Sequence, residues 1–237
     1  MAAEIPVRPD PENAVEPVVV LGGFLSSPSF YRTMCAVIHG LRRCPVEVAN
    51  VWIWHWAAAA SARGWSRILD LLHEVVVPTA LSSPTGKVVL VGHSAGGVIG
   101  RLYLSDQPFQ GRTYAGLERV STLITLGSPH HNPERARLRR DVERRLPGAY
   151  FAPRVRYVVV AGRAVPGTPG GRSCERRAGW FYRHLTGRSE IWGDGLVPVQ
   201  SALLEGAEEI VIDGVYHAPL FGTPWYGSSE IVERWCC

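Results

Sequence analysis

The segment 87–100, which reads KVVLVGHSAGGVIG, constrains the fold of this chain more than any other part of the sequence. Four apolar residues predict a buried strand, the turn Gly92-His93-Ser94-Ala95-Gly96 follows, and an apolar-rich helical stretch comes after it. Glycines on both sides allow a strand and a helix to approach closely at a sharp, strained turn. This G-x-S-x-G pattern therefore predicts a nucleophile elbow that exposes the hydroxyl of Ser94 above a sheet.

Strand-like and helix-like segments alternate along the rest of the chain. We expect strands at 17–21, 46–52, 88–91, 119–126, 155–161 and 209–212, and helices at 29–42, 57–77, 95–105 and 224–235. Pro78 is expected to end the second helix, because proline lacks the N–H that continues a helix. The alternation predicts an α/β fold with a mostly parallel central sheet flanked by helices.

The length and composition fit one domain, 1–237. The chain has 237 residues, and a hydrophobic content of 46% is enough to fill the core of such a domain. The Pro- and Glu-rich stretch 1–16 is expected to be a flexible tail. Two segments, 132–153 and 163–192, leave the sheet at the carboxyl ends of strands, where ligands bind in α/β folds. We expect them to form a small cap or loop insertion.

Charge and cysteine content exclude several classes of protein. A net charge of +4 is too small to indicate a nucleic-acid partner. The sequence has no signal-like apolar region and no run of membrane-spanning length. Its five cysteines show neither metal-ligand spacing nor a disulfide framework, so no metal is expected. We expect a soluble protein of the cytoplasm or an organelle. The oligomeric state and the role of the terminal Cys236 and Cys237 stay open.

A serine nucleophile needs a base, and the base needs a carboxylate that orients it. In an elbow of this type the acid and then the histidine follow the serine along the chain. His217 stands in a loop just after the last expected strand, so we expect it to be the base. Asp194, in the glycine-flanked turn 193–198, is the favoured acid, and Asp213 at the end of the last strand is the alternative.

The tetrahedral intermediate of acyl transfer needs two N–H donors for its oxyanion. One is expected from Ala95, directly after the nucleophile. The second is expected from the loop after the first strand, where Phe24 is the favoured donor and Gly23 and Leu25 are its neighbours.

Four further features are candidates for substrate binding. The aromatic stretch 51–56 includes Trp54, which could line an acyl pocket or touch a lipid surface, although covering the adjacent helix is the favoured role. His93 precedes the nucleophile, and His130 either binds substrate or supports the site from behind. An arginine-rich run could bind anionic head groups or a membrane surface transiently, but an exposed helix explains it more simply; its members are Arg135, Arg137, Arg139, Arg140, Arg144 and Arg145.

Three motifs resemble those of α/β-hydrolases of the lipase and esterase type. The segment 92–97 resembles the lipase elbow, including the histidine before the serine. The segment 123–130, LITLGSPH, resembles a strand end found in lipases and in lipase-like proteins that deacylate glycolipid anchors. The turn 193–198, GDGLVP, resembles the acid loop of the same group. The resemblance covers almost the whole chain, from the loop 21–24 to His217, although the large cap of many lipases is absent or reduced.

The resemblance implies hydrolysis of a carboxylic ester through an acyl-enzyme, without a metal or an organic cofactor. We expect the substrate to be a small-molecule or lipid ester with an apolar acyl group. Acyl transfer and thioester hydrolysis stay open as alternatives, because they share the acyl-enzyme and differ in the acceptor or the leaving group. A non-catalytic binding protein with a hydrolase fold is the remaining alternative.

Overall fold

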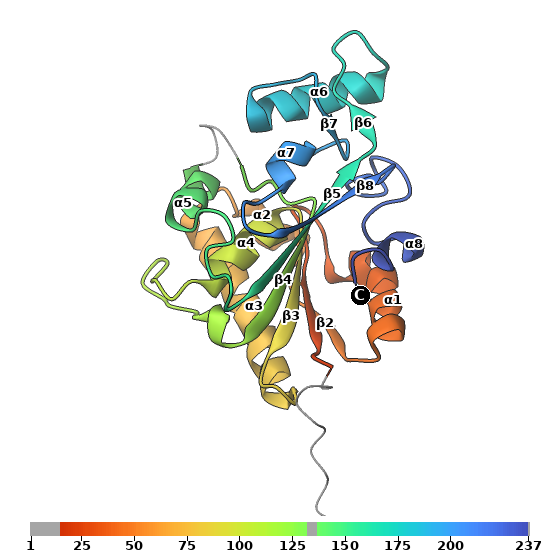
Figure 1. Ribbon diagram of the computed structural model, residues 1–237. Coiled ribbons are helices and arrows are strands. Elements are labelled where there is room, and N and C mark those ends of the chain that lie inside the picture. Colours follow the sequence, from red (N-terminus) through yellow and green to blue (C-terminus); the bar gives the residue numbers. More distant parts are fainter. Residues whose placement is uncertain (1–14, 132–136, 237) are drawn as a thin grey trace, which may run out of the picture.

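The computed structural model describes residues 15–131 and 137–236, which are built around a six-stranded sheet (Figure 1). Its strands lie in the order β2-β1-β3-β4-β5-β8, and every neighbouring pair is parallel. The strands are β1 (Val18–Leu21), β2 (Val46–Val48), β3 (Val88–His93), β4 (Val120–Leu126), β5 (Arg156–Arg163) and β8 (Glu208–Asp213). The predicted parallel sheet flanked by helices is confirmed.

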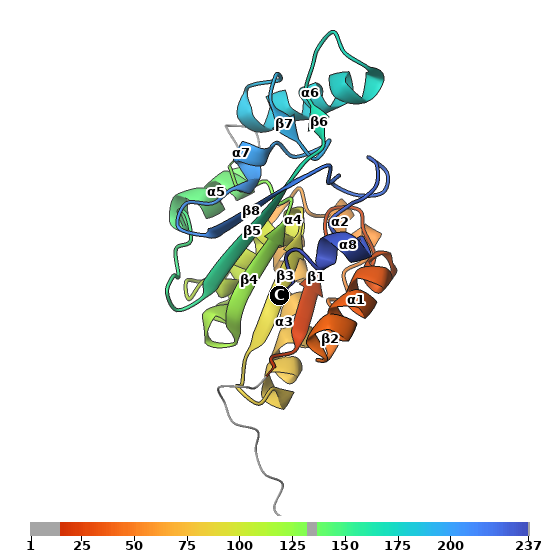
Figure 2. The ribbon, with the colours of Figure 1, turned by 45° about the vertical axis from the view of Figure 1, so that its right-hand side comes forward.

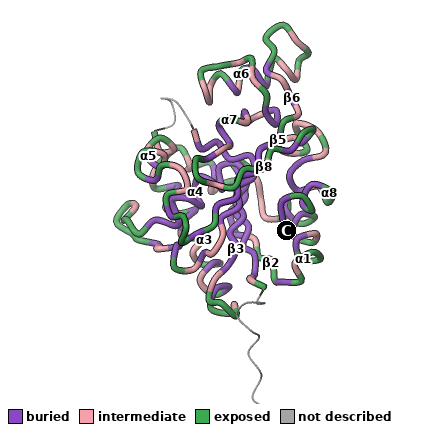
Figure 3. The backbone as a smooth tube through the Cα atoms, viewed as in Figure 1, coloured by how far each residue is buried: buried purple, intermediate pink, exposed green. Residues whose placement is uncertain are grey.

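The four central strands are buried on both faces of the sheet, and their successive side chains point to opposite sides. In β1, Val19 and Leu21 belong to one apolar core, whereas Val18 and Val20 belong to the other. Figure 3 shows the central strands as the most continuously buried part of the chain. The uninterrupted apolar runs in the sequence are thus the signature of a parallel sheet covered on both sides.

Helices cover the two faces unequally. The face of Val19 and Leu21 packs against α3 (Ala62–Ser82) and α4 (Ala95–Leu104). The opposite face packs against α1 (Arg32–Arg42) and the short α8 (Ser229–Val232), as Figure 2 shows. Four smaller elements complete this part of the fold: η2 (Pro28–Tyr31), α2 (Ile53–Ala57), η3 (Gly116–Glu118) and α7 (Val199–Ala202).

The predicted end of the second helix is wrong, because α3 passes through Pro78 and ends at Ser82. Burial of Thr79 and Ala80 accompanies this continuation. The Thr79 hydroxyl also donates to the carbonyl of Val75, at 2.7 Å. The helix begins later than expected, since Ser61 caps it by accepting from the Gly64 N–H at 3.1 Å.

Two other elements are shorter than the sequence pattern predicts. The strand expected over 46–52 ends at Val48, and α2 begins at Ile53. The helix expected over 224–235 is reduced to α8, because Trp225 and Tyr226 before it are drawn into the core as a turn. The Trp235 indole N–H then donates to the Tyr226 carbonyl at 3.0 Å, which closes the chain back on this turn.

Both expected insertions contain helices. The segment 163–192 holds α6 (Ser173–Thr186), which lies between β6 (Val165–Pro166) and its antiparallel partner β7 (Trp192–Gly193), beyond the carboxyl end of β5 (Figure 1). The segment 132–153 holds α5 (Arg137–Arg145), whose Val142 is buried in the core beside α4.

Parts of three expectations lie outside the described residues: the tail over 1–14, Arg135 and Cys237. Glu16, at the end of the expected tail, accepts hydrogen bonds from Thr85 and Ser121. No helix within 15–131 and 137–236 is both long enough and apolar enough to cross a bilayer.

The elbow is a tightly packed turn. A Cβ added to Gly96 would collide with the carbonyl oxygens of Leu21 and Gly22 at the end of β1. One added to Gly92 would lie 2.6 Å from the Gly97 nitrogen. Real side chains do not tolerate such distances to backbone, so both positions require glycine.

Replacing Gly96 with alanine is therefore expected to lower the free energy of unfolding by about 2 kcal/mol or more, since the backbone of β1 must move. Gly40 is the matched control, because it is exposed in α1 and a Cβ there has nothing within 4 Å. Gly40→Ala should raise the free energy of unfolding by about 0.5–1 kcal/mol. Urea denaturation measures both changes, and equal effects of the two substitutions would contradict this packing account.

Candidate active site

Ser94 stands at the tip of the elbow, between β3 and α4. Its backbone has φ 54° and ψ −124°, a conformation that non-glycine residues rarely adopt. The Ser94 N–H donates to the Leu126 carbonyl at the end of β4, at 2.8 Å. The turn is therefore tied to two neighbouring strands, and its strain is maintained by the surrounding packing.

His217 reaches Ser94 from the loop after β8. Its Nε2 lies 3.0 Å from the Ser94 Oγ, and its Nδ1 lies 2.8 Å from the Asp194 Oδ2. A carboxylate can only accept, so Nδ1 carries the proton and Nε2 is left to accept from the serine hydroxyl. All three side chains are buried, with exposed fractions of 8%, 3% and 0% for Ser94, His217 and Asp194.

Asp194 is held by four protein donors. Its Oδ1 accepts from the N–H groups of Leu196 at 2.9 Å and Val197 at 2.7 Å. Its Oδ2 accepts from Tyr226 at 2.9 Å as well as from His217. These four bonds satisfy both oxygens of the buried carboxylate and fix its orientation toward His217.

Sequence reasoning missed Tyr226, which comes from the turn before α8. Its hydroxyl accepts from the Gly162 N–H of β5 at 2.7 Å while it donates to Asp194. Burial, and then the negative charge of Asp194, raise the pKa of this phenol well above its ordinary value. No local motif marks Tyr226, because its role depends on a contact across 32 residues of sequence.

Asp213, the alternative acid, lies elsewhere. It is exposed at the end of β8, and its carboxylate forms an ion pair with Arg163 of β5 at 2.5 Å. The structure therefore brings Asp194, and not Asp213, to the imidazole of His217.

His93 is a buried residue that forms hydrogen bonds with the backbone of His217 and with Tyr31. Its Nε2 lies 3.0 Å from the His217 carbonyl, which can only accept, so Nε2 carries the proton. Its Nδ1 then accepts from the Tyr31 hydroxyl at 2.9 Å, and the Tyr31 oxygen accepts from the Gly23 N–H at 2.8 Å. Burial lowers the pKa of His93 to about 3, so the ring stays neutral. One chain of hydrogen bonds thus connects the loop after β1 to the loop of His217.

The loop after β1 lies directly against Ser94. A Cβ on Gly23 would lie 2.8 Å from the Ser94 Cβ, so only glycine fits there. Because the Gly23 N–H is bonded to Tyr31, it is not the second oxyanion donor. Phe24 and Leu25 follow with half-exposed side chains, and Ala95 begins α4 on the other side of Ser94. The first N–H groups of a helix lack partners within the helix, which suits them to bind an anion.

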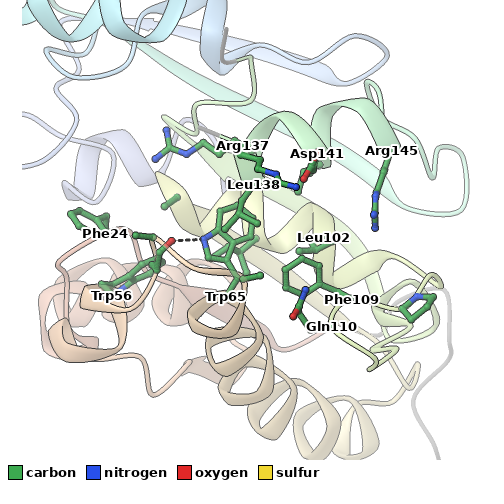
Figure 4. A pocket seen from close by; sticks show the side chains of 18 residues that line it. Phe24, Trp56, Trp65, Leu102, Phe109, Gln110, Arg137, Leu138, Asp141 and Arg145 are labelled. Atoms are coloured by element: carbon green, nitrogen blue, oxygen red, sulfur yellow. Dashed lines mark hydrogen bonds between the residues drawn. The ribbon is translucent and has the colours of Figure 1, made fainter. Parts of the chain in front are cut away.

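A cavity of about 840 Å³ opens beside Ala95 (Figure 4). Phe24 and Trp56 line one end of it, with ring centroids 6.2 Å apart. The cavity then follows α4 past Ile99 and Leu102, beneath α5. Its size and apolar floor suit a ligand larger than an acetyl group.

Two sequence candidates lie away from this cavity. Trp54 is 63% exposed and stacks on Trp52, so Trp56 takes the place in the pocket wall instead. His130 is buried, with its Nε2 3.1 Å from the Thr125 hydroxyl and its Nδ1 3.4 Å from Arg101. His130 is therefore packed between β4 and α4 and does not line the cavity. Within 15–131 and 137–236, no three histidine, cysteine or carboxylate side chains form a group that could hold a metal ion.

The neutral state of His93 generates a pH dependence of stability. Below pH 6.5 the unfolded chain takes up a proton on this histidine that the folded chain, with its pKa of about 3, does not. Stability therefore falls as the pH drops through this range. Between pH 7 and pH 5 the contribution of His93 is about 2 kcal/mol.

We expect His93→Gln, which keeps a donor for the His217 carbonyl, to lose about 2 kcal/mol less stability than the wild type between pH 7 and pH 5. Urea unfolding at the two pH values measures this difference. Identical pH dependence in both proteins would show that His93 takes up its proton in the folded chain as readily as in the unfolded chain.

Comparisons with known proteins agree with this architecture. The sequence model of the PGAP1-like alpha/beta domain family matches residues 65–143, the stretch from α3 to α5 that contains the elbow. No curated protein sequence matches the chain.

Several solved hydrolases share the fold. A pyrethroid hydrolase from Sphingobium faniae JZ-2 has a TM-score of 0.52 and 12% identity, over 93% of this chain and 97% of its own. A predicted CIB-like hydrolase from Thermoplasma acidophilum has a TM-score of 0.51 and 9% identity, over 95% and 86%. The chain spans 42% of the length of a further pyrethroid hydrolase, PytH, with 17% identity and a TM-score of 0.36. The two structures with TM-scores above 0.5 show that the chain has the α/β-hydrolase fold, as its motifs predict.

Proposed function

We propose that this protein hydrolyses carboxylic esters with an apolar acyl group through a serine acyl-enzyme. The observation that carries the proposal is the buried hydrogen-bonded chain from Ser94 through His217 to Asp194. An aligned base makes a serine hydroxyl nucleophilic, and a buried carboxylate stabilises the imidazolium that forms.

In the first half of the reaction, the Ser94 Oγ attacks the ester carbonyl while His217 takes the hydroxyl proton at Nε2. The N–H groups of Ala95 and Phe24 stabilise the oxyanion of the tetrahedral intermediate. This intermediate collapses by breaking the bond to the alcohol oxygen, which leaves with the proton from His217. In the second half, water repeats the attack on the acyl-enzyme, and the acid is released.

The apolar walls of the cavity favour an acyl chain over a polar one. Trp56, Trp65 and Ile99 lie along the path that leads away from Ala95. Phe24, Leu25, Ile53 and Trp54 are exposed on the loop after β1 and on α2, and they are the side chains we expect to meet a lipid surface in a transient contact.

We expect Ser94→Ala to lower kcat/KM for p-nitrophenyl esters by roughly 10⁴-fold or more, since it removes the nucleophile. Asp194→Asn should lower it by roughly 10²- to 10⁴-fold, because an amide holds the imidazole in the wrong tautomer. Asp213→Asn is the matched control and should keep nearly full activity, since this exposed carboxylate contacts Arg163 and not His217.

A rate profile over acyl chains from acetyl to long-chain esters measures these effects. Full activity of Ser94→Ala would contradict the proposal. Loss of activity in Asp213→Asn but not in Asp194→Asn would show that Asp213, and not Asp194, is the acid. Added alcohols or thiols that capture the acyl group faster than water would turn the proposal to acyl transfer.

A further inference from the structure

We infer that the ester carries an anionic group, a carboxylate or a phosphate, which the arginines of α5 bind while the acyl chain lies on α4. The inference rests on the proposed function and names the class of substrate. It is carried by the charge distribution of the cavity beside Ala95, which has an apolar floor and arginines in its roof (Figure 4).

The floor of the cavity leads away from the nucleophile in a straight line. Ala95, Ile99 and Leu102 are spaced by four and three residues, so they lie on one face of α4. With a rise of 1.5 Å per residue, this face extends about 10 Å from the end of the helix that carries Ser94. Trp65 of α3 forms the facing wall, and Phe109 extends the apolar lining beyond Leu102. An acyl chain bound to Ser94 would lie along this floor.

The roof of the cavity is α5. Arg137, Leu138 and Asp141 of this helix line it, and so do Arg139 and Arg145. Figure 4 shows Arg137 toward the end of the cavity with Phe24, and Arg145 over the end with Phe109 and Gln110. Eight residues of helix separate these two arginines, about 12 Å. The roof therefore presents cationic groups both near the scissile ester and at the far end of the acyl path.

Carboxylates of the described residues do not neutralise the arginines of this roof. Among residues 15–131 and 137–236, no carboxylate forms an ion pair with Arg137, Arg139 or Arg145. Asp141, the one acidic residue in the lining, is paired with Arg144 at 3.3 Å. Burial lowers the pKa of Arg139, which is the response of a cation without a nearby counter-charge.

Arg137 and Arg145 are exposed, but Arg139 is partly buried, so a neutral ester would leave the Arg139 cation partly desolvated and unpaired, which is unfavourable. A carboxylate or phosphate offers the guanidinium groups charge-assisted, bidentate hydrogen bonds. The cavity is therefore complementary to an amphiphile with an apolar chain and a negative group. An anion on the alcohol side would meet Arg137, and one at the end of the acyl chain would meet Arg145.

Two pairs of water-soluble esters test the inference and separate the two sources of the anion. The first pair is dioctanoyl phosphatidylglycerol and dioctanoylglycerol, and the second is mono-p-nitrophenyl suberate and p-nitrophenyl octanoate. All are used below the concentration at which they aggregate. We expect the anionic member of at least one pair to have a kcat/KM about tenfold higher or more. Equal rates, or a preference for the neutral member, in both pairs would overturn the inference and leave ester hydrolysis by Ser94 intact.

Variants of α5 show whether the arginines cause the preference. Arg139→Gln should reduce the ratio of anionic to neutral kcat/KM about tenfold, and Arg139→Lys should retain most of it. Arg137→Gln or Arg145→Gln should reduce the ratio for the first or the second pair, respectively. Arg144→Gln is the control, because Arg144 is 74% exposed and paired with Asp141. An unchanged ratio in Arg137→Gln, Arg139→Gln and Arg145→Gln would overturn the role of α5.

A binding measurement distinguishes failure of this inference from failure of the proposed function. Octyl phosphate and octyl glucoside share one chain and differ in charge, and their binding to the full chain needs no catalysis. Calorimetry should show octyl phosphate binding about tenfold more tightly or better, with the difference lost in Arg139→Gln. Equal affinities would overturn the inference even if no ester were hydrolysed.

Discussion

The hydroxyl of Tyr226 is the junction on which the geometry of the site depends. It accepts from the Gly162 N–H in β5 and donates to Asp194, whose other contacts come from its own turn and from His217. Tyr226 thereby ties the orientation of the imidazole to the central sheet, although Asp194 and His217 themselves lie in loops. Buried groups that are fully hydrogen-bonded hold such loops rigidly, because breaking any one bond leaves a desolvated polar atom.

A second set of contacts holds the backbone of His217. His93 bonds the His217 carbonyl and, through Tyr31, reaches the N–H of Gly23. His93 is thus a residue that joins the loop after β1 to the loop of His217. The glycines around Ser94 make this possible, since they let the backbone of the loop after β1 contact the elbow directly.

The sequence was most informative where function depends on local backbone geometry. The elbow and the strands of the parallel sheet follow from residues close together in the chain, and the order serine, acid, histidine follows from the type of elbow. The structure places Ser94 and Asp194 within hydrogen-bonding distance of His217. Tyr226 and the neutral pair of Tyr31 and His93 could not be predicted, because they act across long sequence separations. Pro78 misled the helix prediction since tertiary burial of the residues after it outweighs one lost hydrogen bond.

The central claim is that Ser94 becomes a nucleophile because its hydroxyl donates a hydrogen bond to His217 Nε2. Labelling with a fluorophosphonate, which reacts with activated serines, tests it most directly. Intact-mass measurement and peptide mapping should find one adduct, on Ser94, and His217→Ala should prevent its formation. No adduct on the wild type, an adduct on another serine, or undiminished labelling of His217→Ala would contradict the account.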